Sequence, residues 1–164
     1  MQNQFDKWPD AIHESGHAAA ACYFGWPIRE VSIQAVKTSP ADRVGVCRLG
    51  IETLPVETHE DIMRSIIYAA AGPAAEYLLN IDMGPEVASE YGQIVQNAAR
   101  AFPHDQKAQE AMIKRGQEAA FEMVREYRSG IEALAAALMR LGRVEGATVE
   151  RFINGRSKVA RPQG

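Results

Sequence analysis

The chain has 164 residues, a length that suits one domain with a single hydrophobic core. Hydrophobic residues make up 46% and charged residues 24%, as in ordinary globular proteins, and the net charge of −3 argues against nucleic acid as the main partner. No apolar run is long enough to span a bilayer, and no signal-peptide pattern is present. We therefore expect a cytoplasmic protein without membrane insertion, whose two cysteines, Cys22 and Cys47, are reduced thiols.

The first predicted element is a helix over residues 9–24, with Asp10 as its N-cap. Two segments with alternating apolar residues follow, at 29–36 and 43–52, and the stretch "KTSPAD" between them reads as a turn. We predict that the two segments pair as an antiparallel β-hairpin.

The remainder of the chain is predicted to be helical. Thr58 and Asp61 resemble a capping box, and the helix that they begin is expected to be kinked at Pro73. After a loop, Ser89 is the predicted N-cap of the next helix. Three more helices are expected at 105–128, 130–141 and 147–153.

The predicted fold is therefore mainly α within the α+β class, with one small antiparallel hairpin. One domain is expected over residues 1–154. A basic tail that contains glycine and proline, 155–164, is expected to be flexible.

The most informative stretch is "AIHESGHAAAA", residues 11–21, which contains His-Glu-x-x-His. Residues four apart lie on one face of a helix, so His13 and His17 can place two imidazoles on one zinc ion. Glu14 lies roughly 100° around the helix from His13, where it can reach a zinc-bound water and act as a general base. The alternative is an alanine-rich core helix with two structural histidines, but this spacing favours the metal site.

The surroundings of the motif add a resemblance to a known family. "AIHESGHAAAACYFGWPIREVSI" resembles the start of the peptidase domain of FtsH-type zinc metalloproteases, and "AAAGPAAEYLL" is similar to that family's Gly-x-Ala-Ala-Glu segment. "SEYGQIVQNAAR" resembles the segment that carries the family's third zinc ligand. The resemblance covers about residues 11–154 and implies a zincin-like fold and zinc-dependent peptide hydrolysis. By it, His13 and His17 match the histidine ligands and Glu14 the catalytic glutamate.

The third ligand departs from the family's pattern, because the family uses aspartate and the matching segment has none. Glu90 is the nearest carboxylate, and Glu86 and Asp82 are the runners-up. Glu76 is the other candidate, but we assign it to orienting a ligand histidine, whose second ring nitrogen needs an acceptor. The alternative for Glu90 is a solvent-exposed carboxylate in the first turn of a helix.

The family's membrane spans and ATPase module have no counterpart in this sequence. We expect an enzyme that hydrolyses flexible peptides or unfolded protein segments, bound as a strand along the 29–36 or 43–52 edge. A homo-oligomer or a separate regulatory partner is compatible with the sequence. The competing function is a zinc-binding regulatory or interaction module without turnover, in which a fourth protein ligand closes the metal.

Overall fold

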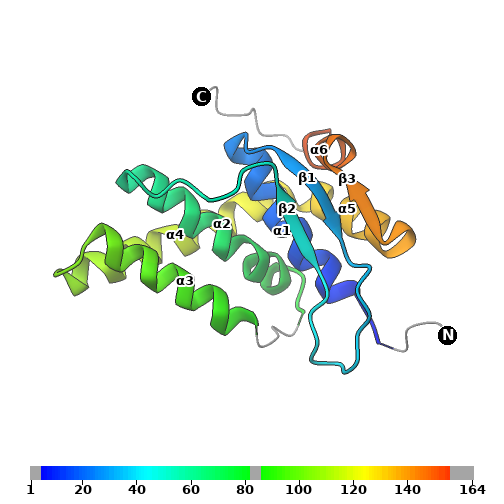
Figure 1. Ribbon diagram of the computed structural model, residues 1–164, viewed down its shortest axis with the longest axis horizontal. Helices are drawn as coiled ribbons and strands as arrows, with labels where there is room; N and C mark the ends of the chain where they lie inside the picture. Colours follow the sequence, from blue (N-terminus) through cyan, green and yellow to red (C-terminus); the bar gives the residue numbers. More distant parts are fainter. Residues whose placement is uncertain (1–4, 82–85, 156–164) are drawn as a thin grey trace.

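The computed structural model describes residues 5–81 and 86–155, with residues 86–89 described by their backbone only. The fold in this part of the chain is mainly helical with a small antiparallel sheet, as predicted (Figure 1). The elements follow in the order α1 (Trp8–Phe24), β1 (Ile28–Ser32), β2 (Val46–Leu49), α2 (His59–Leu78), α3 (Glu86–Ala101), α4 (Gln106–Glu126), α5 (Arg128–Leu141), β3 (Arg143–Glu145) and α6 (Gly146–Asn154).

Helix α1 lies in the interior, and residues 10–22 are all buried. Its alanine run allows this, because a methyl side chain lets neighbouring elements approach from every side. The predicted N-cap is wrong: the helix begins at Trp8, whose amide donates to the Asp6 carboxylate at 2.8 Å. Asp10 is instead 1% exposed, and its carboxylate forms a buried ion pair with Lys37.

The sheet has the order β2-β1-β3, and both strand pairs are antiparallel. The β1–β2 hairpin was predicted correctly, but both strands are shorter than expected, and β3 was not predicted. The segment between β1 and β2 leaves the sheet because side chains outside the sheet form hydrogen bonds with its backbone. Lys7 Nζ donates to the carbonyls of Ile33 and Ala35, and the Val44 amide donates to Asp10.

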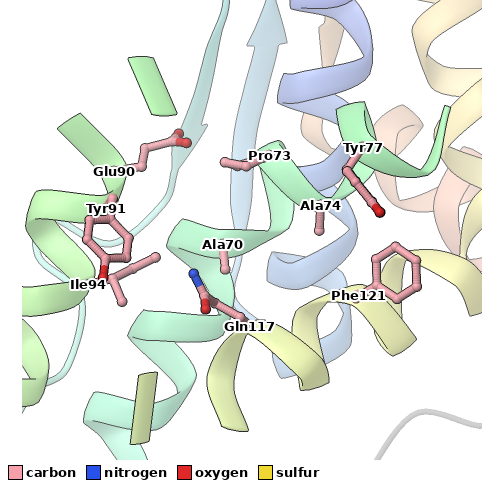
Figure 2. A pocket seen from close by; sticks show the side chains of 9 residues that line it. All are labelled: Ala70, Pro73, Ala74, Tyr77, Glu90, Tyr91, Ile94, Gln117 and Phe121. Carbon is pink, nitrogen blue, oxygen red and sulfur yellow. The ribbon is translucent and has the colours of Figure 1, made fainter. Parts of the chain in front are cut away.

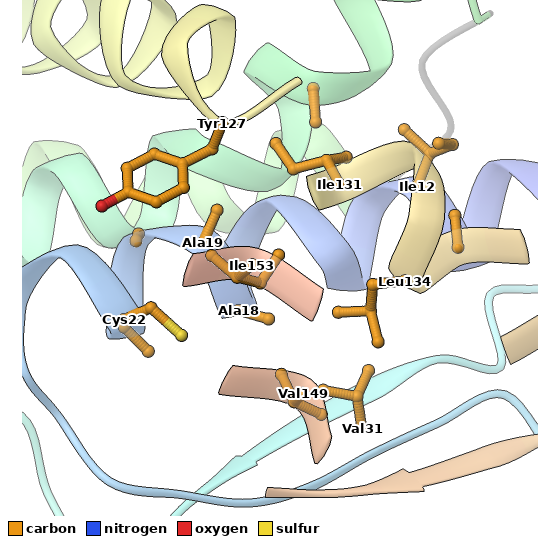
Figure 3. Close-up of a cluster of buried hydrophobic side chains, with 14 of the residues drawn as sticks. Ile12, Ala18, Ala19, Cys22, Val31, Tyr127, Ile131, Leu134, Val149 and Ile153 are labelled. Carbon is orange, nitrogen blue, oxygen red and sulfur yellow. The ribbon is translucent and has the colours of Figure 1, made fainter. Parts of the chain in front are cut away.

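The buried apolar side chains form two clusters. The larger cluster joins α1 to β1, α5 and α6, and Figure 3 shows labelled side chains from all four elements gathered around α1. The smaller one joins α2, α3 and α4 through residues such as Ile66, Ile94 and Met112. None of the helices in the described part of the chain is long and apolar enough to cross a membrane.

Helices α1 and α2 approach closely at Gly16. A Cβ at this position would lie 2.5 Å from the Ala71 carbonyl oxygen and 2.8 Å from the Ala75 Cβ. The missing side chain therefore admits the α2 backbone, which more than offsets the weak helix propensity of glycine. The predicted capping box of α2 is present at Thr58 and Asp61.

Two further sequence predictions concern helix ends. Helix α2 continues through Pro73 to Leu78 as one helix. Helix α3 begins at Glu86, so the prediction that Ser89 caps it is wrong, and Glu90 lies in its second turn. Of the predicted flexible tail, residues 156–164 lie outside the described residues.

Candidate metal centre

The two histidines of the motif lie one turn apart on α1, buried beneath α2 and α3. His13 is 2% exposed and His17 is 7% exposed. Their rings meet edge to face with centroids 4.8 Å apart, and their Nε2 atoms are separated by 3.1 Å. The helix therefore directs the same atom of each ring to one point.

Both rings are held at their other nitrogen. His13 Nδ1 lies 2.9 Å from Glu76 Oε2, and His17 Nδ1 lies 2.8 Å from the backbone carbonyl oxygen of Tyr68. Both partners accept hydrogen bonds, so in a neutral imidazole the Nδ1 atom carries the proton and the Nε2 atom presents the lone pair that a metal ion binds. Metal-binding histidines are commonly held this way, and Glu76 stands where the predicted orienting role requires it.

Glu90 completes the group from α3. Its Oε1 atom lies 2.8 Å from His13 Nε2 and 2.8 Å from His17 Nε2. Its side chain is 16% exposed, so the alternative of a solvent-exposed helix-start carboxylate is wrong. The residues His13, His17 and Glu90 thus form a group that could hold a metal ion.

The donor atoms fit a small divalent cation. Two neutral imidazole lone pairs and a carboxylate oxygen are all acceptors, so each contact between them needs a proton or a metal cation. A proton serves one such contact, whereas a metal ion serves all three. Tetrahedral zinc with bonds of about 2.0–2.1 Å keeps its ligand atoms about 3.3 Å apart, close to the separations of 2.8 and 3.1 Å found here.

Gly72 on α2 makes room beside the two imidazoles. A Cβ at this position would lie 2.6 Å from His17 Nε2 and 2.7 Å from His13 Nε2. No side chain fits at that point without displacing the histidines. Glycine is therefore required here by the site, in the same segment whose sequence resembles the family's Gly-x-Ala-Ala-Glu element.

Glu14 faces the same cavity as the ligands and is 8% exposed. Burial raises the pKa of its carboxyl above the usual range, while the nearby charges of His17 and His13 oppose this rise. A raised pKa suits a carboxylate that must accept a proton and later return it near neutral pH. Gly45 lies against it, since a Cβ there would be 2.4 Å from Glu14 Cγ.

The cavity over the site has a volume of about 370 Å³. Its walls come from α1, α2, α3 and the start of β2, where Gly45, Val46 and Cys47 line it. The Cys47 thiol is hydrogen-bonded to Tyr68, and burial raises its pKa, which favours the neutral thiol. Tyr68 also stacks on His17, with ring centroids 5.0 Å apart.

A second pocket lies on the other side of Glu90, between α2, α3 and α4 (Figure 2). Its volume is about 270 Å³, and Glu90 is the residue that it shares with the cavity over the histidines. Apolar and aromatic side chains form most of its wall: Ala70, Pro73, Ala74, Tyr77, Tyr91, Ile94 and Phe121. The carboxylate of Glu90 therefore separates a polar cavity from an apolar one.

Other sequence candidates do not join the group. Asp82 lies outside the described residues, and the side chain of Glu86 is not described. Glu76 contacts His13 at Nδ1 and is therefore on the side of the ring away from the group. Among the side chains described, those of residues 5–81 and 90–155, the group contains no further histidine, cysteine or acidic residue.

Sequence reasoning missed three residues that shape the site: Tyr68, Gly72 and Arg43. Tyr68 acts through its backbone carbonyl, which carries no sequence signal. Arg43 lies at the end of a loop and forms a 2.5 Å ion pair with Glu76. Gly72 was visible as part of a motif, but only the fold shows what its missing side chain leaves free.

The sequence was compared with models of known protein families and with curated proteins, and it matches none of them.

Proposed function

We propose that the protein is a zinc metallopeptidase with a zincin-like site of the FtsH type. His13, His17 and Glu90 would hold the zinc ion, and Glu14 would be the general base. The observation that carries this proposal is the convergence of two imidazole Nε2 atoms and one carboxylate oxygen within 3.1 Å, beside a buried glutamate in the same cavity. Zinc in such a site acidifies a water molecule to a pKa of about 7 and polarises a carbonyl group.

Glu14 is suited to move the proton in this reaction. Its carboxylate takes a proton from the attacking water and passes it to the amine that leaves when the peptide bond breaks. Burial, which raises its pKa, favours the uptake of that proton by the carboxylate. Gly45 keeps the carboxylate close to the start of β2, so the base lies next to the strand that borders the cavity.

Strand β2 is the element best placed to bind a peptide backbone. It pairs with β1 on one side and has no strand on its other side among the described residues. An extended peptide can pair with that edge through main-chain hydrogen bonds, which demand no particular sequence. The 29–36 segment is excluded as such an edge, since β1 is the central strand, between β2 and β3.

The competing function, a regulatory module with a closed zinc site, requires a fourth protein ligand. The group of potential ligands found in the described part of the chain has three members. Cys47, the thiol of the cavity wall, is hydrogen-bonded to Tyr68 and does not belong to this group. Three ligands with an open position are typical of catalytic zinc rather than structural zinc.

The test is Glu14→Gln, with Glu52→Gln as a control at an exposed position after β2. Both variants and the wild type are loaded with equimolar zinc and assayed on dye-labelled casein as an unfolded protein. We expect Glu14→Gln to retain zinc and to lose hydrolysis by roughly 10²–10⁴-fold, and Glu52→Gln to match the wild type. Equal turnover by Glu14→Gln and the wild type would contradict the assigned mechanism.

A further inference from the structure

Four charged side chains form a buried network of ion pairs beside the candidate metal centre. Lys37 Nζ lies 2.7 Å from Asp10 Oδ2, Arg43 lies 3.9 Å from Asp10 Oδ1, and the other arm of Arg43 lies 2.5 Å from Glu76 Oε1. The four side chains are between 0% and 7% exposed. Two positive and two negative charges balance, so this buried network of ion pairs carries no net charge.

This network of ion pairs ends at Glu76, which contacts the candidate metal ligand His13. Glu76 uses Oε1 for Arg43 and Oε2 for His13 Nδ1, so both of its oxygens are engaged. Rotation of the carboxylate away from the imidazole would give up both the ion pair with Arg43 and the contact with His13. The pairing with Arg43 therefore fixes the acceptor that keeps His13 turned with its Nε2 atom toward His17 and Glu90.

The positive partners both come from the segment between β1 and β2. Lys37 also donates to the backbone carbonyl of Asp6, and the amide of Val44 donates to Asp10. The same segment continues directly into Gly45 and Val46, which line the cavity over the histidines. Anchoring of this loop and orientation of His13 thus depend on the same carboxylates, Asp10 and Glu76.

A purely structural reading does not account for this arrangement. Burying ion pairs costs desolvation, and apolar side chains of similar volume stabilise a core equally well or better. A buried pair is more useful where its geometry must be unique. Here that geometry determines the direction of one imidazole ring.

We propose that Arg43 is a positioning residue of the metal centre, which acts through Glu76 on His13, so that the loop over residues 33–45 sets the affinity of the site for zinc. The inference rests on the metal site of the proposed function, but not on hydrolysis. Outer partners of metal-bound histidines typically contribute 10–100-fold to metal affinity.

The experiment measures zinc dissociation constants by competition with a chromophoric chelator at neutral pH. Arg43→Met is compared with Arg48→Met, a matched control on β2 whose side chain is 62% exposed and pairs with Glu30. We expect roughly 10–100-fold weaker zinc binding for Arg43→Met and a change within about twofold for Arg48→Met. Arg43→Lys, which can keep the pair with Glu76, should restore most of the affinity.

A double-mutant cycle with Glu76→Gln shows whether the effect passes through Glu76. If it does, Arg43→Met with Glu76→Gln binds zinc no more weakly than Glu76→Gln alone. This double variant also removes both buried charges, which keeps the test open if Arg43→Met does not fold. The absorption spectrum of bound Co²⁺ should shift in the Arg43 variants, which loss of stability alone would not cause.

The outcomes separate the two proposals. No zinc binding by the wild type contradicts the proposed function itself. Tight zinc binding by the wild type and equally tight binding by Arg43→Met would overturn only the positioning role. A loss of zinc affinity in the double variant equal to the product of the two single losses would also overturn it. That result would mean that Arg43 and Glu76 act independently.

Discussion

The two halves of the metal centre are built in different ways. His13 and His17 lie four residues apart on a buried helix, and each ring is held at Nδ1 by α2. Glu90 lies more than seventy residues away on α3, which packs on α2 and α4 through a separate apolar cluster. Its Oε1 atom faces the histidines, but its Oε2 atom has no hydrogen-bond partner among the described residues.

This difference shows which half is fixed by the core and which by packing between helices. The histidine half cannot change without disturbing α1, whose residues 10–22 are all buried. The carboxylate half depends on where α3 lies against α2, and one rotatable side chain makes the contact. We therefore expect substitutions in the histidine half to abolish metal binding and changes around Glu90 to tune it.

The largest effect is expected at Gly72. In Gly72→Ala the new Cβ would lie 2.6 Å from His17 Nε2 and 2.7 Å from His13 Nε2, so the rings must move apart. We predict at least about 100-fold weaker zinc binding, more than loss of a single outer partner causes. The measurement is a zinc titration against a competing chelator.

Gly92→Ala is the matched control on the carboxylate half. A Cβ at this position of α3 meets nothing within 4 Å, and alanine favours a helix by up to about 1 kcal/mol over glycine. This variant should bind zinc like the wild type and melt at an equal or higher temperature. If Gly72→Ala also binds zinc like the wild type, the assigned position of the metal is wrong.

A smaller effect on zinc binding is expected when the pH changes, because the pKa shifts of His13 and Glu90 have opposite directions. Burial opposes a charge on His13, but hydrogen bonds to Glu76 and Glu90 outweigh it and raise the pKa of His13 to about 10. Burial favours neutral Glu90, but hydrogen bonds to His13 and His17 lower its pKa to about 2. Near neutral pH His13 is therefore protonated in the metal-free protein, whereas the carboxylate of Glu90 is ionised.

Zinc must displace the proton on His13. We predict the release of about one proton per zinc, and an apparent affinity that rises roughly tenfold per pH unit up to about pH 10. Calorimetry in two buffers of different ionisation enthalpy measures the release. Between pH 6 and pH 8 we expect the zinc affinity to rise on the order of a hundredfold. An affinity that stays constant over this range would contradict the coupling.

The same shifts affect the stability of the metal-free protein. The raised pKa of His13 stabilises the fold fully below its ordinary value of 6.5, and this contribution is lost as pH rises through about 10. The lowered pKa of Glu90 stabilises the fold above 4.5, and this contribution is lost as pH falls through about 2. Both contributions to stability are complete only between pH 4.5 and pH 6.5.

The smallest effect is expected at Asp42, in the loop that carries Arg43. Its carboxylate accepts hydrogen bonds from the amides and hydroxyls of Thr38 and Ser39, which lower its pKa to about 2. This contribution is present above pH 3.8 and is lost as pH falls through about 2. Asp42→Ala should slightly lower the melting temperature at neutral pH, and the difference should shrink in acid. A difference that stays constant with pH would contradict the role of the carboxylate.

The sequence predicts best what depends on near neighbours. The spacing of His13 and His17 and the capping box at Thr58 follow from helical geometry, and both helices are present. Asp10 shows the limit of such reasoning. It has the right residue type for an N-cap, but a long-range ion pair with Lys37 takes its carboxylate into the core.

The missed features all depend on residues far apart in the chain. Strand β3 has three residues and is stabilised by pairing with β1, more than a hundred residues earlier. The strands at 29–36 and 43–52 are shortened because Lys7 and Asp10 bind their backbone. Among the candidate third ligands, only the packing of α3 on α2 distinguishes Glu90 from Glu76, since both are carboxylates at helical positions.

The central claim is that two imidazoles and one carboxylate hold a zinc ion that keeps an open position. X-ray absorption at the zinc edge of the purified, zinc-loaded protein tests it most directly. We predict a first shell of nitrogen and oxygen only, with the outer-shell signature of two imidazoles and no sulfur. A sulfur ligand, which would indicate a closed structural site, or failure to bind zinc at all, would contradict the account.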